Sequence, residues 1–196
     1  ARDEEIFTTG AIARPYGVPR PVVNSCTPIP AASCSVPHRK SLAGVAARQT
    51  LDMQHKFVFE LGWRAYFRHV WQHRGDAILR SLHDGPLPNA VYATELPADI
   101  RQGCTGVPAI DEAVRTLHPT GMLHNHARMW LASYVVHLRK VHWRSGADWL
   151  YGHLLDGDLA SNHLSWRWVA GTGSRKPYLF NADNVARYAP ASWHSP

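Results

Sequence analysis

Two carboxylates flank a glycine late in the sequence, at Asp156, Gly157 and Asp158, and Asn162 follows about one helical turn later. The glycine permits close approach of the backbone to another group, and the Asn162 amide can both donate and accept hydrogen bonds. A carboxylate buried at such a place needs a cationic partner, because an unpaired buried charge is costly. These residue types suit the binding of a polar ligand group. The alternative is an ordinary loop or helix cap between two helices.

Other site chemistries have weaker support in the sequence. His69 and His73 stand four residues apart and could hold a metal ion on one helix face, but no third ligand accompanies them. Cys26, Cys34 and Cys104 form no Cys-x-x-Cys pair, which argues against a disulfide framework, a zinc ribbon and an iron–sulfur cluster. Neither a Ser/His/Asp nucleophile motif nor a complete dinucleotide fingerprint is present. We therefore expect no metal site.

The composition limits the kind of scaffold that can position these residues. The chain has 196 residues, of which 45% are hydrophobic and 18% charged, so it is long enough for one globular domain, with or without a tail. Lys and Arg exceed Asp and Glu by 21 − 15 = 6, which allows an anionic partner but does not establish one. No run of ~18 apolar residues occurs, so we expect no membrane span. Reduced thiols favour a cytoplasmic location.

Residues 1–50 differ from the rest of the chain. After Glu5 the next acidic residue is Asp52, and six of the 14 prolines lie between Pro15 and Pro37. No sustained period of 2 or 3.6 is present, so this segment is predicted to be irregular or disordered. Its acid-poor start is also compatible with an organelle transit peptide, although it has no clear amphipathic helix. A third interpretation is a shifted reading frame or gene start.

The sequence from 51 to 196 predicts a helical domain. Pro108 suits the first turn of a helix, Thr120 and Ser145 are predicted to cap two more, and Gly171 is predicted to end the last. The predicted helices cover 52–73, 108–117, 121–141, 145–156 and 159–170. Strand signals are almost absent, so the predicted fold class is all-α.

Four ordered blocks of this sequence resemble the photolyase/cryptochrome family. They are 60–64, then 105–108 with Asp111, then 120–129, and finally 155–162 with the tryptophans and glycines of 166–173. The resemblance covers about residues 52–190. It implies the helical FAD-binding domain of that family. In this domain the segment from Asp156 to Asn162 would bind the polar ring edge of a flavin. Family members are usually more than twice this length, so it also implies that their α/β antenna domain is absent.

The resemblance implies a set of cofactor-binding residues. Arg128 would pair with Asp156 beside the isoalloxazine of FAD. Asn162 matches the family position that faces flavin N5, where a neutral amide can serve more than one redox state. The implied FAD-binding residues are Asn125, Arg128, Asp156, Gly157, Asp158 and Asn162.

An electron path is implied as well. Trp166 and Trp143 match the first two members of the family's tryptophan chain, which feeds electrons to the photoexcited flavin. The third position falls near Ala90, and Tyr92 is the candidate substitute. The alternative for these indoles is ordinary core packing. Core packing is the favoured interpretation for two other indoles, Trp130 and Trp149.

A substrate cavity is implied by a further set of residues. In photolyases the matching positions line the cavity for a flipped pyrimidine dimer, with aromatic rings to stack on and polar groups to read base edges. The residues expected in this catalytic cavity are Glu60, Trp63, Asn125, Met129 and Trp168. Core packing remains the alternative for Trp63 and Met129. Contacts to DNA are expected from Arg64, His126, Arg175 and Lys176.

Two departures from the family bear on function. The Leu-Ser-Pro segment that clamps the FAD phosphates is not found in residues 1–50, and His126 replaces an arginine that contacts DNA. The leading hypothesis is a photolyase-like lyase in which reduced flavin passes an electron to a flipped dimer in UV-damaged DNA under blue light. The alternatives are a cryptochrome-like photosensor that binds a protein partner without repair, and a remnant that no longer binds FAD.

Overall fold

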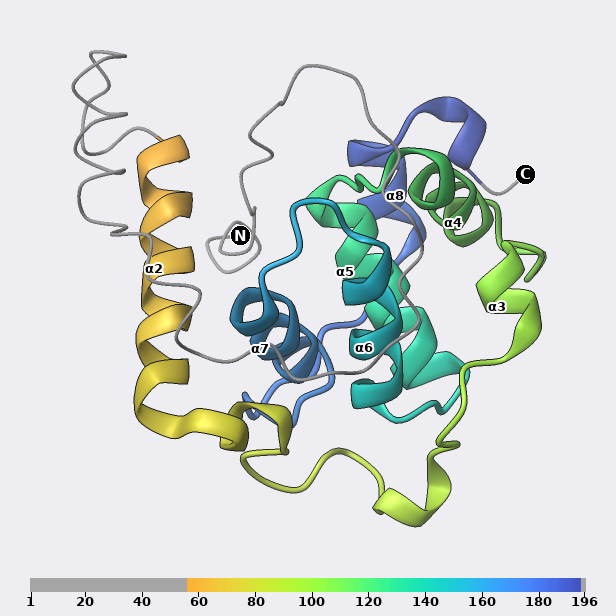
Figure 1. Ribbon diagram of the computed structural model, residues 1–196. Helices are drawn as coiled ribbons and strands as arrows, with labels where there is room; N and C mark the ends of the chain where they lie inside the picture. Colours follow the sequence, from red (N-terminus) through yellow and green to blue (C-terminus); the bar gives the residue numbers. More distant parts are fainter. Residues whose placement is uncertain (1–55, 195–196) are drawn as a thin grey trace.

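The computed structural model describes residues 56–194, and every regular element in that range is helical (Figure 1). The longer helices are α2 (Lys56–Arg74), α4 (Pro108–Thr120), α5 (Asn125–Ser133), α6 (Trp143–His153) and α7 (Leu159–Val169). The shorter ones are η2 (Gly75–Leu79), η3 (Asn89–Val91), α3 (Ala98–Gln102), the π-helical η4 (Tyr134–Leu138), α8 (Ala182–Tyr188) and η5 (Ala191–Trp193). Between residues 56 and 194 the only β-pairing is an isolated bridge from Ala93 to Val141, so the all-α prediction is confirmed.

Helix α2 lies along one side of the helical bundle and packs against α7 (Figure 1). The helix predicted over 52–73 ends at Arg74, and its first predicted residues lie outside the described range, as does the segment 1–50. A small apolar cluster, which we call the α2 cluster, joins α2 to η2 and α7. It consists of Phe67, Ile78, Ala160 and Leu164.

The main core is a larger apolar cluster to which α3, α4, α5, α6, α7 and α8 all contribute. Helix α7 takes part in both clusters, since its Trp166 and Val169 belong to the main core and two other residues belong to the α2 cluster. Trp130 is 1% exposed in the main core and donates from Nε1 to Asn184 Oδ1 at 2.6 Å, which confirms core packing for this indole. Trp149 is partly buried against the same cluster. Helix α7 therefore connects the two parts of the domain, the α2 cluster and the main core.

The start of α4 matches the prediction and has a clear cause. Pro108 occupies the first turn, where its missing N–H breaks no intrahelical hydrogen bond. The buried Asp111 carboxylate accepts hydrogen bonds from the Thr105 amide and hydroxyl, both at 2.7 Å, and from the Gly106 amide at 3.0 Å. The sequence block around residues 105–111 thus fixes the loop that leads into α4.

The cap at Thr120 and the start at 121 that were predicted for the helix over 121–141 are wrong, whereas α5 and η4 cover most of its predicted length. Gly121 adopts φ 62° and ends α4, while the Thr120 hydroxyl donates back to the Thr116 carbonyl. A side chain at Gly121 would also collide with Leu155, because an added Cβ would lie 2.5 Å from its Cγ. The next helix, α5, begins only at Asn125 and passes into the π-helical segment η4.

The predicted cap at Ser145 is also wrong, whereas α7 follows the prediction. The N-cap of α6 is His142, whose Nδ1 accepts from the Arg144 amide at 3.2 Å, and Ser145 lies inside the helix. Helix α7 starts after Asp158 and ends before Gly171, which has φ 72°. No helix within residues 56–194 is long and apolar enough to cross a lipid bilayer.

Candidate functional site

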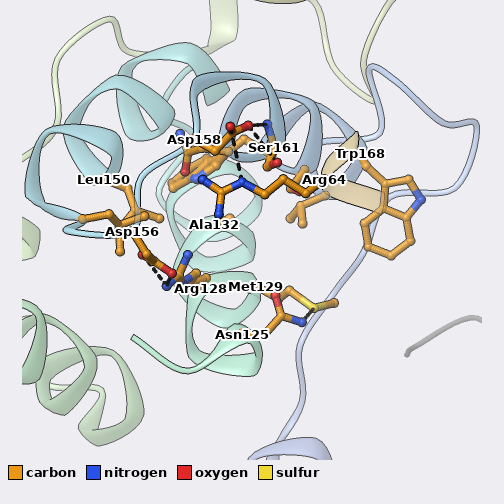
Figure 2. Close-up of a pocket in the computed structure, with 15 residues that line it drawn as sticks. Arg64, Asn125, Arg128, Met129, Ala132, Leu150, Asp156, Asp158, Ser161 and Trp168 are labelled. Carbon is orange, nitrogen blue, oxygen red and sulfur yellow. Dashed lines mark hydrogen bonds and ion pairs between the residues drawn. The ribbon is translucent and has the colours of Figure 1, made fainter. Parts of the chain in front are cut away.

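A pocket with about 580 Å³ of open space, part of it continuous with solvent, lies between α5 and α7, with further contributions from α2, α6 and the loop before α7 (Figure 2). The pocket is lined by Arg64, Asn125, Arg128, Met129, Ala132, Leu150, Leu154, Asp156, Asp158, Ser161, Asn162, Ser165, Trp166, Trp168 and Val169. It brings together the residues that the sequence assigns to the cofactor, from positions 125 to 162, with the exception of Gly157.

The first carboxylate of the loop, Asp156, forms the expected pair with Arg128. The Arg128 Nη2 group donates to Asp156 Oδ1 at 2.9 Å and to Oδ2 at 2.8 Å, and the two side chains are only 15% and 17% exposed. Arg128 also donates from Nε to the Leu123 carbonyl at 2.8 Å, which anchors its stem to the turn before α5. The pair joins α5 to the 154–158 loop at the edge of the pocket (Figure 2).

The second carboxylate, Asp158, has two tasks. It caps α7 by accepting hydrogen bonds from the Ser161 amide at 3.0 Å and hydroxyl at 2.9 Å. It also pairs with two arginines of α2: Arg68 Nε lies 2.5 Å and Arg64 Nε 3.5 Å from Asp158 Oδ2. Burial alone raises the pKa of Asp158, but the Ser161 amide and the two guanidiniums outweigh it and hold the pKa of this carboxyl below its ordinary value. Asp158 is therefore a carboxylate at neutral pH and ties α2 to α7.

Asn162 lines the pocket from the second turn of α7. Its Nδ2 donates to the Ala147 carbonyl of α6 at 2.8 Å. That bond uses the nitrogen end of the amide and leaves the oxygen for an occupant of the pocket. On α5, Asn125 Nδ2 lies 3.6 Å from the Met129 sulfur, a weak acceptor, so its amide also keeps most of its hydrogen-bonding capacity for a ligand.

The two tryptophans of the implied electron path lie where α6 and α7 meet. Trp166 lines the pocket and packs directly on Gly146 of α6, where an added Cβ would come within 2.3 Å of the indole. Trp143 is buried and donates from Nε1 to Ser81 Oγ at 3.0 Å. Trp143 also lines a second, smaller cavity together with Tyr92. Burial raises the pKa of the Tyr92 phenol, which keeps it protonated at neutral pH.

Some predicted site residues lie elsewhere. Glu60 is buried and Trp63 is partly buried on α2, but neither lines the pocket. The Trp63 ring meets Phe67 at 5.8 Å, next to the α2 cluster. Gly157 is also outside the pocket lining, and a Cβ there would meet the Leu154 carbonyl at 3.1 Å.

The residues predicted to contact DNA are spread over three places. Arg64 lies in the pocket wall on Asp158. His126 stacks on Tyr188 with ring centroids 3.8 Å apart. Arg175 and Lys176 are exposed in the segment after α7.

Several pocket residues were missed from the sequence. Arg68 gives Asp158 its shortest ion pair, and its position four residues after Arg64 places both guanidiniums on one face of α2. Small side chains at Ala132 and Ser165 leave room in the pocket. Each follows a predicted site residue by three positions on its helix, and that spacing was the available signal.

The charges around the pocket fit FAD. Two arginines and two aspartates line the pocket, and Arg68, outside the lining, adds a third cation through its ion pair with Asp158. Within residues 56–194, Arg64 Nε is buried and makes no hydrogen bond, its nearest carboxylate oxygen being Asp158 Oδ2 at 3.5 Å. A cationic donor in this position suits a ligand with acceptor oxygens, which FAD carries on its flavin, ribityl and phosphate groups. The described part of the chain has no cluster of three or more His, Cys, Asp or Glu residues arranged to hold a metal ion.

Comparison with known proteins gives the same assignment. The sequence model of the FAD binding domain of DNA photolyase matches residues 57–191. The deoxyribodipyrimidine photo-lyase of Streptomyces griseus is 41% identical over an alignment that covers 60% of this chain and 26% of that protein. The cryptochrome DASH of Gloeobacter violaceus is 37% identical over an alignment that covers 63% of this chain and 25% of that protein. The chain therefore spans about a quarter of the length of these curated relatives.

Solved structures share the same fold. An archaeal photolyase from Sulfolobus tokodaii, described as holding two FAD molecules, superposes with a TM-score of 0.62 at 25% identity, over 74% of this chain and 34% of its own. A cryptochrome from Synechocystis sp. PCC6803 superposes with a TM-score of 0.61 at 30% identity, and the superposition covers 76% of this chain and 32% of the cryptochrome. This chain belongs to the photolyase and cryptochrome family and contains the family's helical FAD-binding domain.

Proposed function

We propose that this chain holds FAD in the α5–α7 pocket and uses it for blue-light-driven repair of a flipped pyrimidine dimer in UV-damaged DNA. The observation that supports the proposal most is the pair of aspartates flanking Gly157, each neutralised by arginine at the wall of one pocket. Bound FAD would supply light absorption and electron donation. The rest of the proposal concerns what the chain's own side chains do.

The pocket wall offers separate groups for cofactor and substrate. The Arg128–Asp156 pair and the Asn162 amide would receive the polar edge of the isoalloxazine. Asn125 and Met129 on α5 and Trp168 on α7 lie at the other side of the pocket, as Figure 2 shows, and would receive a base. Trp168 is held from behind by Tyr178, with ring centroids 5.9 Å apart.

Electron supply to the cofactor would pass through the α6–α7 interface. Trp166 lies in the pocket wall, and Trp143 lies behind it beside the cavity that also contains Tyr92. We propose Tyr92 as the outermost donor, in place of the tryptophan that is missing near Ala90. A Trp166→Phe variant would then bind FAD normally but lose photoreduction, measured by bleaching of flavin absorbance under blue light.

The repair test uses the full chain reconstituted with FAD and an oligonucleotide with one pyrimidine dimer. We expect light-dependent loss of the dimer, none in the dark, and loss of FAD retention in Asp156→Ala. Glu112→Gln, a change at a partly exposed residue that does not line the pocket, is the matched control that should repair normally. Absence of repair by protein with FAD shown to be bound would contradict the lyase proposal, and purified protein that retains no flavin absorbance would contradict FAD binding itself.

One observation favours a second function, a blue-light photosensor without repair. At the position where the family resemblance implies an arginine for DNA, this chain has His126, and its ring is stacked on Tyr188. Light-dependent changes in flavin absorbance without measurable DNA binding would support the photosensor. Dimer-specific DNA binding would support the photolyase.

A further inference from the structure

A buried histidine links α6 and α7 just behind the pocket. His163 is 0% exposed, and its Nε2 lies 2.9 Å from Asp148 Oδ1. Its Nδ1 lies 2.9 Å from the Leu159 carbonyl oxygen, one turn back on the same helix. Each ring nitrogen of His163 therefore faces an oxygen acceptor, one on its own helix and one on α6. The Tyr151 ring approaches edge-on with its centroid 5.9 Å away.

The partner of this histidine is a carboxylate at neutral pH. Burial raises the pKa of Asp148, but hydrogen bonds from His163 and Arg144 outweigh it, so the pKa of Asp148 lies below its ordinary value. Arg144 Nε donates to both Asp148 oxygens at 2.8 Å from the preceding turn of α6. Asp148, itself 51% exposed, therefore connects the partly buried Arg144 on its own helix with the buried ring of His163 on α7.

A second link between the helices lies beside the first. Asn162 and His163 are neighbours on α7, and the groups they bind, the Ala147 carbonyl and the Asp148 carboxylate, belong to neighbouring residues on α6. The two bonds therefore fix the same register of α7 against α6. Of the two α7 residues, Asn162 lines the pocket and His163 does not.

We propose that the His163–Asp148 hydrogen bond is a positioning element for Asn162: it holds α7 in the register that keeps the Asn162 nitrogen on Ala147 and its oxygen toward the pocket. A side-chain amide that rotates by half a turn would present donors where it now presents an acceptor. The bond between the buried His163 ring and the Asp148 carboxylate selects one of these orientations. The consequence for the flavin rests on the proposed function, whereas the positioning itself does not.

The first test needs no cofactor. Solvent exchange of the Asn162 side-chain NH₂ group is measured by NMR in the full chain. We expect exchange to rise about tenfold in His163→Leu, as for the loss of one hydrogen bond, while Asp148→Glu stays within about twofold because the carboxylate is retained. Arg144→Met removes the arginine partner of Asp148 without touching His163 and should leave exchange unchanged.

The second test uses FAD. In His163→Leu the midpoint potential of bound FAD should fall by about 30 mV, which corresponds to a tenfold change in the equilibrium constant of a two-electron reduction. Arg144→Met should not change the midpoint potential. If the wild-type chain binds no FAD, the proposed function fails, and the exchange measurement still decides the positioning role. Unchanged Asn162 exchange in a His163→Leu variant with native circular dichroism would overturn the proposal, and if that variant does not fold, Asp148→Ala replaces it with the same expectation.

Discussion

The two carboxylates of one short loop are supported by different halves of the domain. Asp156 is held by Arg128, which stands on α5 among residues of the main core. Asp158 is held by Arg68 and Arg64 of α2, whose apolar docking surface is the four-residue α2 cluster. The first pair is built into the large main core, and the second joins two helices whose shared apolar cluster has fewer buried members.

This difference assigns the two ion pairs different mechanical roles. Apolar burial in the main core already holds α5 against the 154–158 loop. The Arg128–Asp156 bond therefore orients the two side chains at an interface that exists without it. On the other side, charge carries more of the contact, because Asp158 holds α2 and caps α7 with the same side chain. The pocket thus combines a rigid wall with a wall that depends on electrostatics.

The largest expected effect comes from Asp158→Ala. It removes the cap of α7 and leaves two partly buried guanidiniums without their carboxylate, so we expect a loss of about 3–5 kcal/mol in the free energy of unfolding. Hydrogen exchange should show α2 opening first. Asp156→Ala is the matched variant, and its loss should be smaller, about 1–3 kcal/mol, because Arg128 keeps the Leu123 carbonyl. Equal losses by urea denaturation would contradict the comparison.

The next effect tests packing in the two halves with the same substitution. Gly146→Ala places a Cβ 2.3 Å from the Trp166 ring, so we expect a loss of about 1–3 kcal/mol and a blue or red shift of indole fluorescence. Gly62→Ala in α2 has no atom within 4 Å of the added Cβ and should gain about 0.5–1 kcal/mol from helix propensity. A stable Gly146→Ala protein with unchanged fluorescence would show that the α6–α7 contact is looser than the distances indicate.

The sequence was sufficient for the parts of the site that rest on local order. The Arg128–Asp156 pair follows from matched blocks, and its hydrogen bonds confirm it. The extent of α7 follows from Asp158 and Gly171, since both signals are local. The Thr120-Gly121 pair was misread because a threonine before a glycine can start one helix or end another, and only the fit of Gly121 against Leu155 decides between them.

Other features depend on contacts that a single sequence does not reveal. Histidine is an uncommon cap, so His124 and His142 gave no capping signal, yet both accept a backbone N–H at the start of a helix. The rotation of α2 about its axis is set by packing on α7, which directs Arg64 and Arg68 to Asp158 and leaves Glu60 outside the pocket lining. Helical spacing alone is compatible with either orientation.

Acid should weaken the main core more than the α2 cluster. Burial lowers the pKa of His137 and of His142, so in the folded state both stay neutral below the pH at which an unfolded histidine takes up a proton, about 6.5. Their contribution to stability is complete above that pH and is lost as the pH falls through their lowered values. Stability measured between pH 7.5 and pH 5, a range chosen to span about 6.5, should decline. His142→Asn, which keeps a capping side chain, should decline less, and an unchanged slope would count against this origin.

The smallest expected effect defines the baseline for the comparison. Glu112→Gln breaks an ion pair in which Arg115 is 56% and Glu112 36% exposed, and Arg115 keeps its bond to the Gly103 carbonyl. Water screens such a pair, so we expect a change within about 0.5 kcal/mol, measured by urea denaturation at low and high salt. Burial is then what separates this pair from those at Asp156 and Asp158. A loss above about 1 kcal/mol would exceed the usual worth of an exposed pair, and it would mean that charge also supports the main core, so that the contrast between the two walls of the pocket is one of degree.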